Sequence, residues 1–280
     1  MILRRLVIAV AAVISTGCGT QRAPSETPVV LVSVPPLGGL TEELLGTTAA
    51  VRHLVPVGAN PDTYEPTMDQ LRMGARARHW VRVGHPGFPL ERVWLAALVE
   101  SYPAMGTTAL WDASDNAAGD PHCWLDPRAV SRVIPGLAED LARAFPEDAA
   151  GIRARGVALV ARADSLHAEL TERLAPFRGR TFAVFHPAWG AFAEAYGLRQ
   201  VALEHEGKEP SVEEMATLVD SLRVLGVTTV FAQPQFGRQG VEVLAGELGA
   251  TIKVLNPLLP DWEENLRQTA DALVASWSDE

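Results

Sequence analysis

Short apolar runs alternate with segments of helical periodicity along most of this chain. The runs lie at residues 29–34, 51–57, 79–84, 180–186, 198–204, 228–234 and 251–257. Strands that alternate with helices in this way form βαβ units, whose strands assemble into mostly parallel sheets. With 280 residues, 48% of them hydrophobic, the chain can bury one large core or two modest ones. The pattern therefore predicts an α/β fold in which helices flank the sheets.

The alternation is interrupted at residues 147–176. Apolar residues recur there at helical spacing, namely Ile152, Leu159, Ala163, Leu166, Leu170 and Leu174. Because the segment has no interior proline, it can form one helix about 45 Å long. Such a helix in the middle of a strand-rich chain predicts a strut that joins two α/β lobes, residues 29–146 and 177–280. The alternative is two shorter helices that break at Gly156.

The N-terminal residues 1–17 are typical of a secretory signal peptide. Two arginines precede an apolar run at 6–14, and small residues follow it. Nine apolar residues are too few to span a bilayer as a mature helix. The segment ends at Cys18, which resembles the cysteine of the bacterial lipobox, where it is lipidated and becomes the mature N-terminus. Because Ser15 stands where that motif usually has leucine, an ordinary cleaved signal is the alternative.

The expected mature chain begins with a tether and is strongly acidic. Residues 18–28 are polar, contain proline and lack periodicity, which suits a tether between a lipid-anchored end and the folded body. Removal of residues 1–17 takes away two arginines and no acids, so the formal net charge falls from −10 to −12. This balance argues against nucleic-acid binding, which needs clustered Lys and Arg. If Cys18 carries lipid, Cys123 has no second thiol for an intramolecular disulfide.

Two of the seven histidines lie where ligands of open α/β sheets collect, beyond the carboxyl ends of strands. His186 ends an apolar run and precedes Pro187, so its strand should stop there. His122 follows Pro121 and precedes a helix that Asp126 is expected to cap, with proline in the first position. One histidine belongs to each predicted lobe. Two imidazoles that meet across an inter-lobe cleft would begin a transition-metal site.

Oxygen ligands for such a site are available in the loop at residues 58–71. This loop follows a predicted strand and contains Asp62 and Glu65. The alternative is a simple turn, because an Asn-Pro-Asp sequence favours turns for local reasons.

Several ordered motifs carry a resemblance to a known family. They are "VPVGANPDTYEPTMDQL", "DPHCWLDPRAV", "FHPAWGAFAEAYGL" and "EGKEPS". The chain resembles the zinc- and manganese-binding lipoproteins that serve bacterial ATP-binding-cassette importers. The resemblance implies two α/β lobes bridged by one long helix, with the metal bound in the cleft between them. By motif position, the resemblance implies that His122 and His186 are metal ligands. It also implies a monomeric protein whose partner is a permease. The expected location is the periplasm or the outer face of the cytoplasmic membrane.

Two positions depart from the family pattern. Asp62 stands where the first motif normally has a histidine ligand, and Asn256 stands where an acid often precedes a Pro-Leu pair. Asp62 can coordinate, but its side chain is shorter than that of histidine, so its loop must move inward or another group must fill the gap. His85 and Glu204 are the candidates for that role. Asn256 would be a weak neutral ligand.

The expected ligand set favours a metal ion that binds both nitrogen and oxygen ligands. Two histidines and one aspartate bind zinc well, and zinc is the first choice. The carboxylate makes the set harder than three histidines, which shifts preference toward manganese or iron as alternatives. Cys123 is adjacent to His122, and neighbouring residues in an extended segment point to opposite sides. We therefore expect Cys123 to be buried rather than to bind the metal.

The leading functional hypothesis is a solute-binding protein that captures a divalent metal outside the cytoplasm and has no enzymatic role. The first rival is a secreted metal-dependent hydrolase, in which His122, His186 and Asp62 leave one coordination position for water and Glu65 or Glu204 acts as base. The sequence contains neither HExxH nor Gly-x-Ser-x-Gly, which such enzymes often carry. The second rival is a metal-free family member that acts as an adhesin or sensor.

Overall fold

The computed structural model of the chain describes residues 27–103, 105–111, 119–204 and 207–278. The predicted signal peptide, Cys18 and most of the tether lie outside the described residues. Within these ranges no helix combines the length and the apolar composition needed to cross a bilayer.

The first sheet contains four parallel strands. They are β1 (Val29–Val32), β2 (Ala50–His53), β3 (His79–Arg82) and β4 (Gly106–Ala109), in the order β2-β1-β3-β4. The first three strands were predicted from their apolar runs. The fourth was missed, because its sequence Gly-Thr-Thr-Ala has no run of large apolar residues and it pairs with one neighbour at the edge of the sheet.

The second sheet repeats the arrangement of the first. Its strands are β5 (Thr181–Val184), β6 (Arg199–Ala202), β7 (Thr229–Ala232) and β8 (Thr251–Val254), in the order β6-β5-β7-β8, again all parallel. The α/β fold with parallel sheets is therefore confirmed, and all four strands of this sheet were predicted.

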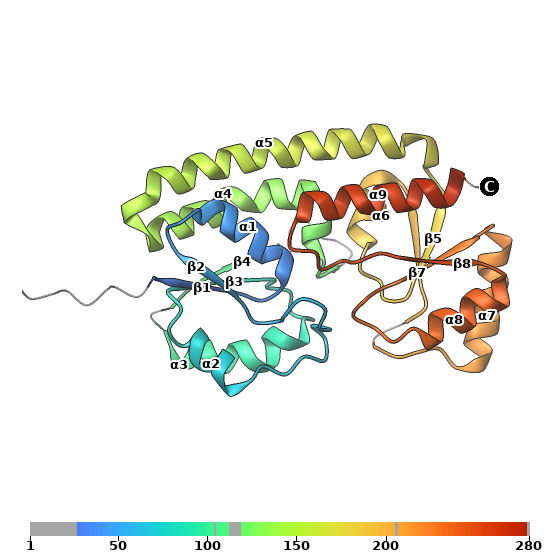
Figure 1. Cartoon of the computed structure of the whole chain (residues 1–280), viewed down its shortest axis with the longest axis horizontal. Helices are drawn as coiled ribbons and strands as arrows, with labels where there is room; N and C mark the ends of the chain where they lie inside the picture. Colours follow the sequence, from blue (N-terminus) through green and yellow to red (C-terminus); the bar gives the residue numbers. More distant parts are fainter. Residues whose placement is uncertain (1–26, 104, 112–118, 205–206, 279–280) are drawn as a thin grey trace, which may run out of the picture.

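Nine α-helices surround the two sheets in the described part of the chain. They are α1 (Pro35–Leu45), α2 (Met68–Gly74), α3 (Ala96–Ser101), α4 (Pro127–Ala144), α5 (Ala149–Leu174), α6 (Gly190–Tyr196), α7 (Val212–Val224), α8 (Gln239–Leu248) and α9 (Trp262–Ser278). Figure 1 shows α5 extending along one side of the molecule over both lobes. Single 3₁₀ turns at Pro146–Asp148 and Ala175–Phe177 flank it.

The long helix α5 is continuous, as the single-helix prediction required, and it does not break at Gly156. That glycine is buried where α4 crosses α5. A Cβ atom at Gly156 would lie 2.8 Å from the Cβ of Ala138. The glycine therefore allows the two helices to approach more closely than any side chain would. Its role is to permit this close packing, although glycine can weaken a helix elsewhere.

The two lobes share a core rather than meeting at a narrow hinge. One cluster of buried apolar side chains includes Val30 of β1, Leu166 of α5, Phe182 of β5 and Leu266 of α9. A second, smaller cluster lies within the C-terminal lobe alone. Because the shared cluster joins both sheets to the strut, any rotation of one lobe against the other would disrupt close packing.

Polar contacts add to this connection between the lobes. The Nε1 atom of Trp124, which is fully buried, donates a hydrogen bond to the carbonyl oxygen of Pro257 at 2.8 Å. On the surface, Arg162 of α5 pairs with Glu43 of α1 and with Glu263 of α9. Exposed ion pairs contribute little, about 0–1 kcal/mol each. The buried packing, rather than these pairs, keeps the lobes in place.

Two helices begin at side-chain caps, and the first of these caps was predicted. Asp126 precedes α4 and accepts a hydrogen bond from the backbone N–H of Arg128, with Pro127 in the first helical position. Ser211 and Glu214 form a reciprocal capping box at the start of α7. The first of these caps fixes where α4 begins, five residues after His122.

The contact at Gly156 predicts opposite effects for two glycine substitutions. In Gly156→Ala the new methyl group would collide with Ala138, and we expect a net loss of stability on the order of 1 kcal/mol, because overpacking outweighs the gain in helix propensity. Gly136→Ala, an exposed position with open space around it, should gain about 0.5–1 kcal/mol. Urea denaturation of both variants measures this. An equal gain in both would contradict the proposed role of Gly156.

Candidate metal centre

The ends of three neighbouring strands position His186, which follows β5. Its backbone N–H donates to Oε1 of Gln233, which follows β7, at 2.6 Å. Its Nδ1 atom lies 3.1 Å from Oε2 of Glu204, which follows β6. The ring of Phe236 stacks on the imidazole with a centroid separation of 4.9 Å. His186 is thus held by one hydrogen bond at its backbone, one at Nδ1 and a stacking contact on one face of the ring.

His122 lies in the segment between β4 and α4, and Asp120 determines its orientation. The Oδ1 atom of Asp120 accepts hydrogen bonds from the backbone N–H of His122 at 2.9 Å and from its Nδ1 at 2.8 Å. The Oδ2 atom accepts from the backbone N–H of Ala191 at the start of α6, at 3.0 Å. Asp120 therefore links a ligand candidate of the first lobe to a helix of the second.

The two imidazoles face each other through their Nε2 atoms, which are 3.3 Å apart. A carboxylate can only accept hydrogen bonds, so each Nδ1 carries the proton that it donates. Each neutral ring then has its lone pair on Nε2. Two lone pairs at this distance repel each other unless a proton or a metal ion lies between them. Two tetrahedral ligands at about 2.0–2.1 Å from a zinc ion would themselves be about 3.3 Å apart.

The two carboxylates behind the histidines stay ionised although they are almost buried. Burial works to raise the pKa of Asp120, but its hydrogen bonds from His122 outweigh this effect and hold the pKa below its usual range. Burial likewise acts to raise the pKa of Glu204, and the hydrogen bond from His186 lowers it overall. Such carboxylate–histidine pairs are the usual support of imidazole metal ligands, because they fix the tautomer and raise basicity.

A small cavity of about 20 Å³ lies at this point between the lobes. Its lining consists of Asn60, Pro61, Asp62, Phe88, His122, Trp124, His186, Gln235, Phe236, Pro257 and Leu258. A single water molecule needs roughly 10–15 Å³ of such space. The cavity therefore has room for one ion and not for an organic substrate.

Asp62 approaches the histidine pair without completing it. Its Oδ2 atom is 3.8 Å from Nε2 of His186, and its side chain is 36% exposed, against 13% for the histidine. Its backbone N–H donates to Oδ1 of Asn60, which closes a local turn. Among the described residues, no group of three or more His, Cys, Asp or Glu side chains is assembled tightly enough to hold a metal ion.

The other predicted candidates lie beside the cavity rather than in it. Glu204 supports His186 from behind through the contact at Nδ1. His85 is not part of the lining; its ring lies edge-on against Trp111 with centroids 4.6 Å apart, and its Nδ1 accepts from the backbone N–H of Gly87. The Oδ1 atom of Asn256 already accepts two hydrogen bonds, from Leu258 and from Gln235. The structure therefore brings together only Asp62 and the two histidines.

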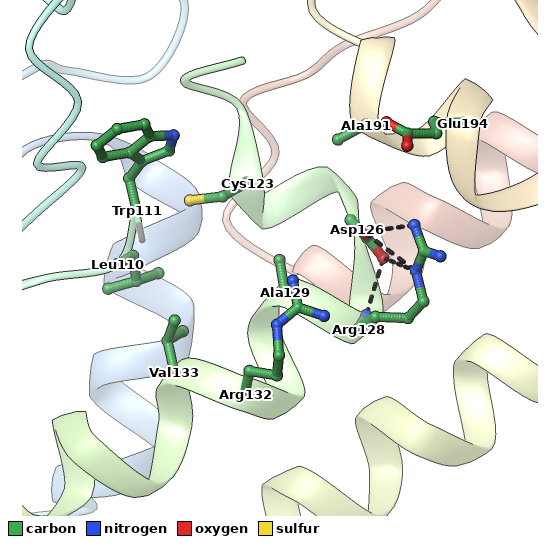
Figure 2. A pocket seen from close by; sticks show the side chains of 10 residues that line it. All are labelled: Leu110, Trp111, Cys123, Asp126, Arg128, Ala129, Arg132, Val133, Ala191 and Glu194. Carbon is green, nitrogen blue, oxygen red and sulfur yellow. Dashed lines mark hydrogen bonds and ion pairs between the residues drawn. The ribbon is translucent and has the colours of Figure 1, made fainter. Parts of the chain in front are cut away.

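Cys123 points away from the histidine pair, as expected, although the backbone differs from the predicted extended segment. Residues Cys123–Leu125 form a 3₁₀ turn that begins directly after His122. Figure 2 shows the sulfur of Cys123 pointing toward Trp111 in a separate hollow. Burial raises the pKa of the thiol to about 12, so it stays protonated and is a poor metal ligand.

Three polar residues of the centre, Asp120, Gln233 and Gln235, were missed from the sequence. No role at the metal was predicted for Asp120, although its position two residues before His122 lets it reach Nδ1 of that histidine. Gln235 was not considered at all. It follows β7 in a loop, and no sequence pattern indicates that its side chain reaches the cavity.

The sequence matches the family model "Zinc-uptake complex component A periplasmic" over residues 30–276. The chain belongs to this family. A structure described as the crystal structure of ZnuA is 34% identical to it, with a TM-score of 0.82 over 90% of this chain and 99% of that one. The predicted family resemblance and the two-lobe fold with a long linking helix are thereby confirmed.

Curated relatives within the family carry names that refer to metals. The zinc-binding protein AdcA of Streptococcus pyogenes is 28% identical over 158 residues, which are 56% of this chain and 31% of that protein. The manganese-binding lipoprotein MntA of Halalkalibacterium halodurans is 26% identical over 263 residues, 88% of this chain and 85% of that protein. The alignment thus spans only about a third of the streptococcal relative.

The hydrogen bonds of the two histidines predict an uncommon tautomer. In the metal-free protein at about pH 8.5, where an ordinary imidazole is neutral, both His122 and His186 should carry their proton on Nδ1. Nitrogen-15 NMR of the ring nitrogens distinguishes the two tautomers. In Asp120→Ala, His122 should change to the Nε2–H form while His186 keeps its tautomer. A wild-type spectrum with both protons on Nε2 would contradict the geometry.

Proposed function

We propose that this protein is an extracytoplasmic solute-binding protein that captures a divalent transition metal and delivers it to the permease of an ATP-binding-cassette importer. The facing Nε2 atoms of His122 and His186, 3.3 Å apart, carry the proposal. Their lone pairs converge on one point, and a metal ion at that point would replace the repulsion between them with two coordinate bonds. The chemistry is coordination and release, so we assign the protein no enzymatic role.

Zinc is the proposed cargo, with manganese and iron as alternatives. Two imidazole nitrogens and the carboxylate of Asp62 form a set that zinc accepts readily. For Asp62 to bind, its Oδ2 must move inward from its present position 3.8 Å from Nε2 of His186. Asp62 and Thr63 are exposed, which leaves this turn room to make the movement. The zinc- and manganese-binding names of the family relatives support the same choice of metals.

We further propose the location and organisation that the sequence predicts. Residues 1–17 direct secretion, and Cys18 carries a lipid that holds the protein at the outer face of the membrane or in the periplasm. Residues 29–146 and 177–280 form the two lobes of a monomer. The lipoprotein name of MntA supports the anchor. No part of this proposal requires nucleic acid or a membrane-spanning segment.

Calorimetric titration of the metal-free protein with zinc and manganese tests the proposed ligands. We expect submicromolar zinc binding with one ion per chain. His122→Ala and His186→Ala should each lower the affinity at least about a hundredfold, because each removes a direct ligand, and even supporting residues of metal sites cost 10–100-fold. Asp62→Ala should cause a smaller but measurable loss.

A matched control for these variants is His85→Ala, since this histidine lies in the same lobe but outside the cavity lining. Its affinity should equal that of the wild type. Absence of binding to any of the metals by the wild-type protein would refute the proposed function. An unchanged affinity in Asp62→Ala would show that another group fills the third position.

The shared core predicts that metal binding moves the loop at Asp62 and not the lobes. Small-angle X-ray scattering should therefore give the same radius of gyration with and without zinc. A hinged solute-binding protein instead closes around its ligand. A clear compaction of the protein when zinc is added would contradict the prediction.

A further inference from the structure

Gln235 lines the same small cavity as the two histidines and carries an oxygen atom with no hydrogen-bond partner among the residues that the structure describes. This atom, Oε1, is buried from water. At its other end, the amide donates from Nε2 to Oδ1 of Asn256 at 2.8 Å. Buried carbonyl oxygens almost always have a partner, because an unpartnered one loses its hydration without compensation. A buried acceptor without a protein partner, on a side chain that lines the cavity, is a candidate to bind a cation there.

The backbone determines which end of the amide is the oxygen. The N–H of Leu258 donates to Asn256 at 3.0 Å, so the atom of Asn256 that receives it must be Oδ1. That oxygen also faces the Gln235 amide, and only an NH₂ group can lie 2.8 Å from it without repulsion. The chain of contacts from Leu258 through Asn256 thus fixes the orientation of Gln235 and keeps Oε1 away from Asn256.

We propose that Oε1 of Gln235 is the fourth ligand of the bound metal and that Asn256 holds it in position. This inference rests on the proposed function and adds a ligand to that site. It gives a closed set of two imidazole nitrogens from His122 and His186, one carboxylate oxygen from Asp62 and one amide oxygen. Four ligands are what a zinc site with no open position requires.

The neutral side chain of Asn256 suits this arrangement. An aspartate or glutamate there would add a negative charge beside the cavity. Asn256 instead has its oxygen engaged with Leu258 and Gln235, so it acts as a positioning residue for the glutamine. The ligand set then keeps a single negative charge, that of Asp62.

An amide oxygen also affects the choice of metal. Carbonyl and carboxylate oxygens are hard ligands that suit manganese better than they suit softer ions, whereas imidazole suits zinc. Loss of the Gln235 oxygen should therefore weaken manganese binding more than zinc binding. This difference distinguishes a ligand from a residue that only fills space. Loss of a space-filling residue would lower the affinities for both metals equally.

The test is a titration of the full mature chain with zinc alone and with manganese alone. In Gln235→Leu, manganese affinity should fall at least about tenfold, and zinc affinity should fall by a smaller factor. Gln239→Leu is the matched control: the same change at an exposed glutamine at the start of α8, which should leave both affinities unchanged. Asn256→Ala removes the acceptor of the glutamine amide and should reproduce part of the Gln235→Leu loss.

The outcomes separate this inference from the proposed function. Normal zinc and manganese affinities in Gln235→Leu would overturn the role of Gln235 and leave metal capture intact. Equal losses for both metals, together with a lower melting temperature of the metal-free variant, would show a packing role and would also overturn it. If the wild-type chain binds no metal, both proposals fail.

Discussion

The fixed approach of two imidazole nitrogens, Nε2 of His122 and Nε2 of His186, is the contact on which the rest of this structure depends. Each ring is oriented by a carboxylate at Nδ1, Asp120 in one case and Glu204 in the other. Both lone pairs then point at the same place. The arrangement is unfavourable without a cation, so the stability of the surrounding protein must maintain it. This is how a binding site is prepared before its ligand arrives.

Metal coordination allows errors of only about 0.2 Å in ligand distance, so the two lobes cannot be loosely joined. The long helix α5, packed closely against α4 at Gly156, supports both sheets on one continuous core. Asp120 reinforces this connection at the site itself, because one of its oxygens binds His122 and the other binds the start of α6. What can move is the exposed turn that carries Asp62.

Much of this architecture follows from local sequence patterns. The apolar runs predicted seven strands, and the unbroken periodicity of 147–176 predicted the strut, because hydrophobic spacing reports directly on which residues face a core. The strand β4 was not predicted, because its sequence Gly-Thr-Thr-Ala lies at an edge of the sheet and has no large apolar side chains. His122 and His186 could be identified from the sequence because each stands beside a proline, His186 at the end of a predicted strand and His122 ahead of a predicted helix.

The remaining parts of the centre depend on contacts between distant segments. No spacing in the sequence indicates that Asn256 would engage its oxygen with Gln235, or that Glu204 would lie behind a histidine instead of in the cavity. The most direct test of the account is a crystal structure of the zinc-loaded protein with anomalous scattering at the zinc edge. We expect one zinc peak about 2.0–2.1 Å from Nε2 of both His122 and His186. A zinc peak elsewhere, with the two nitrogens still facing each other across an empty gap, would contradict it.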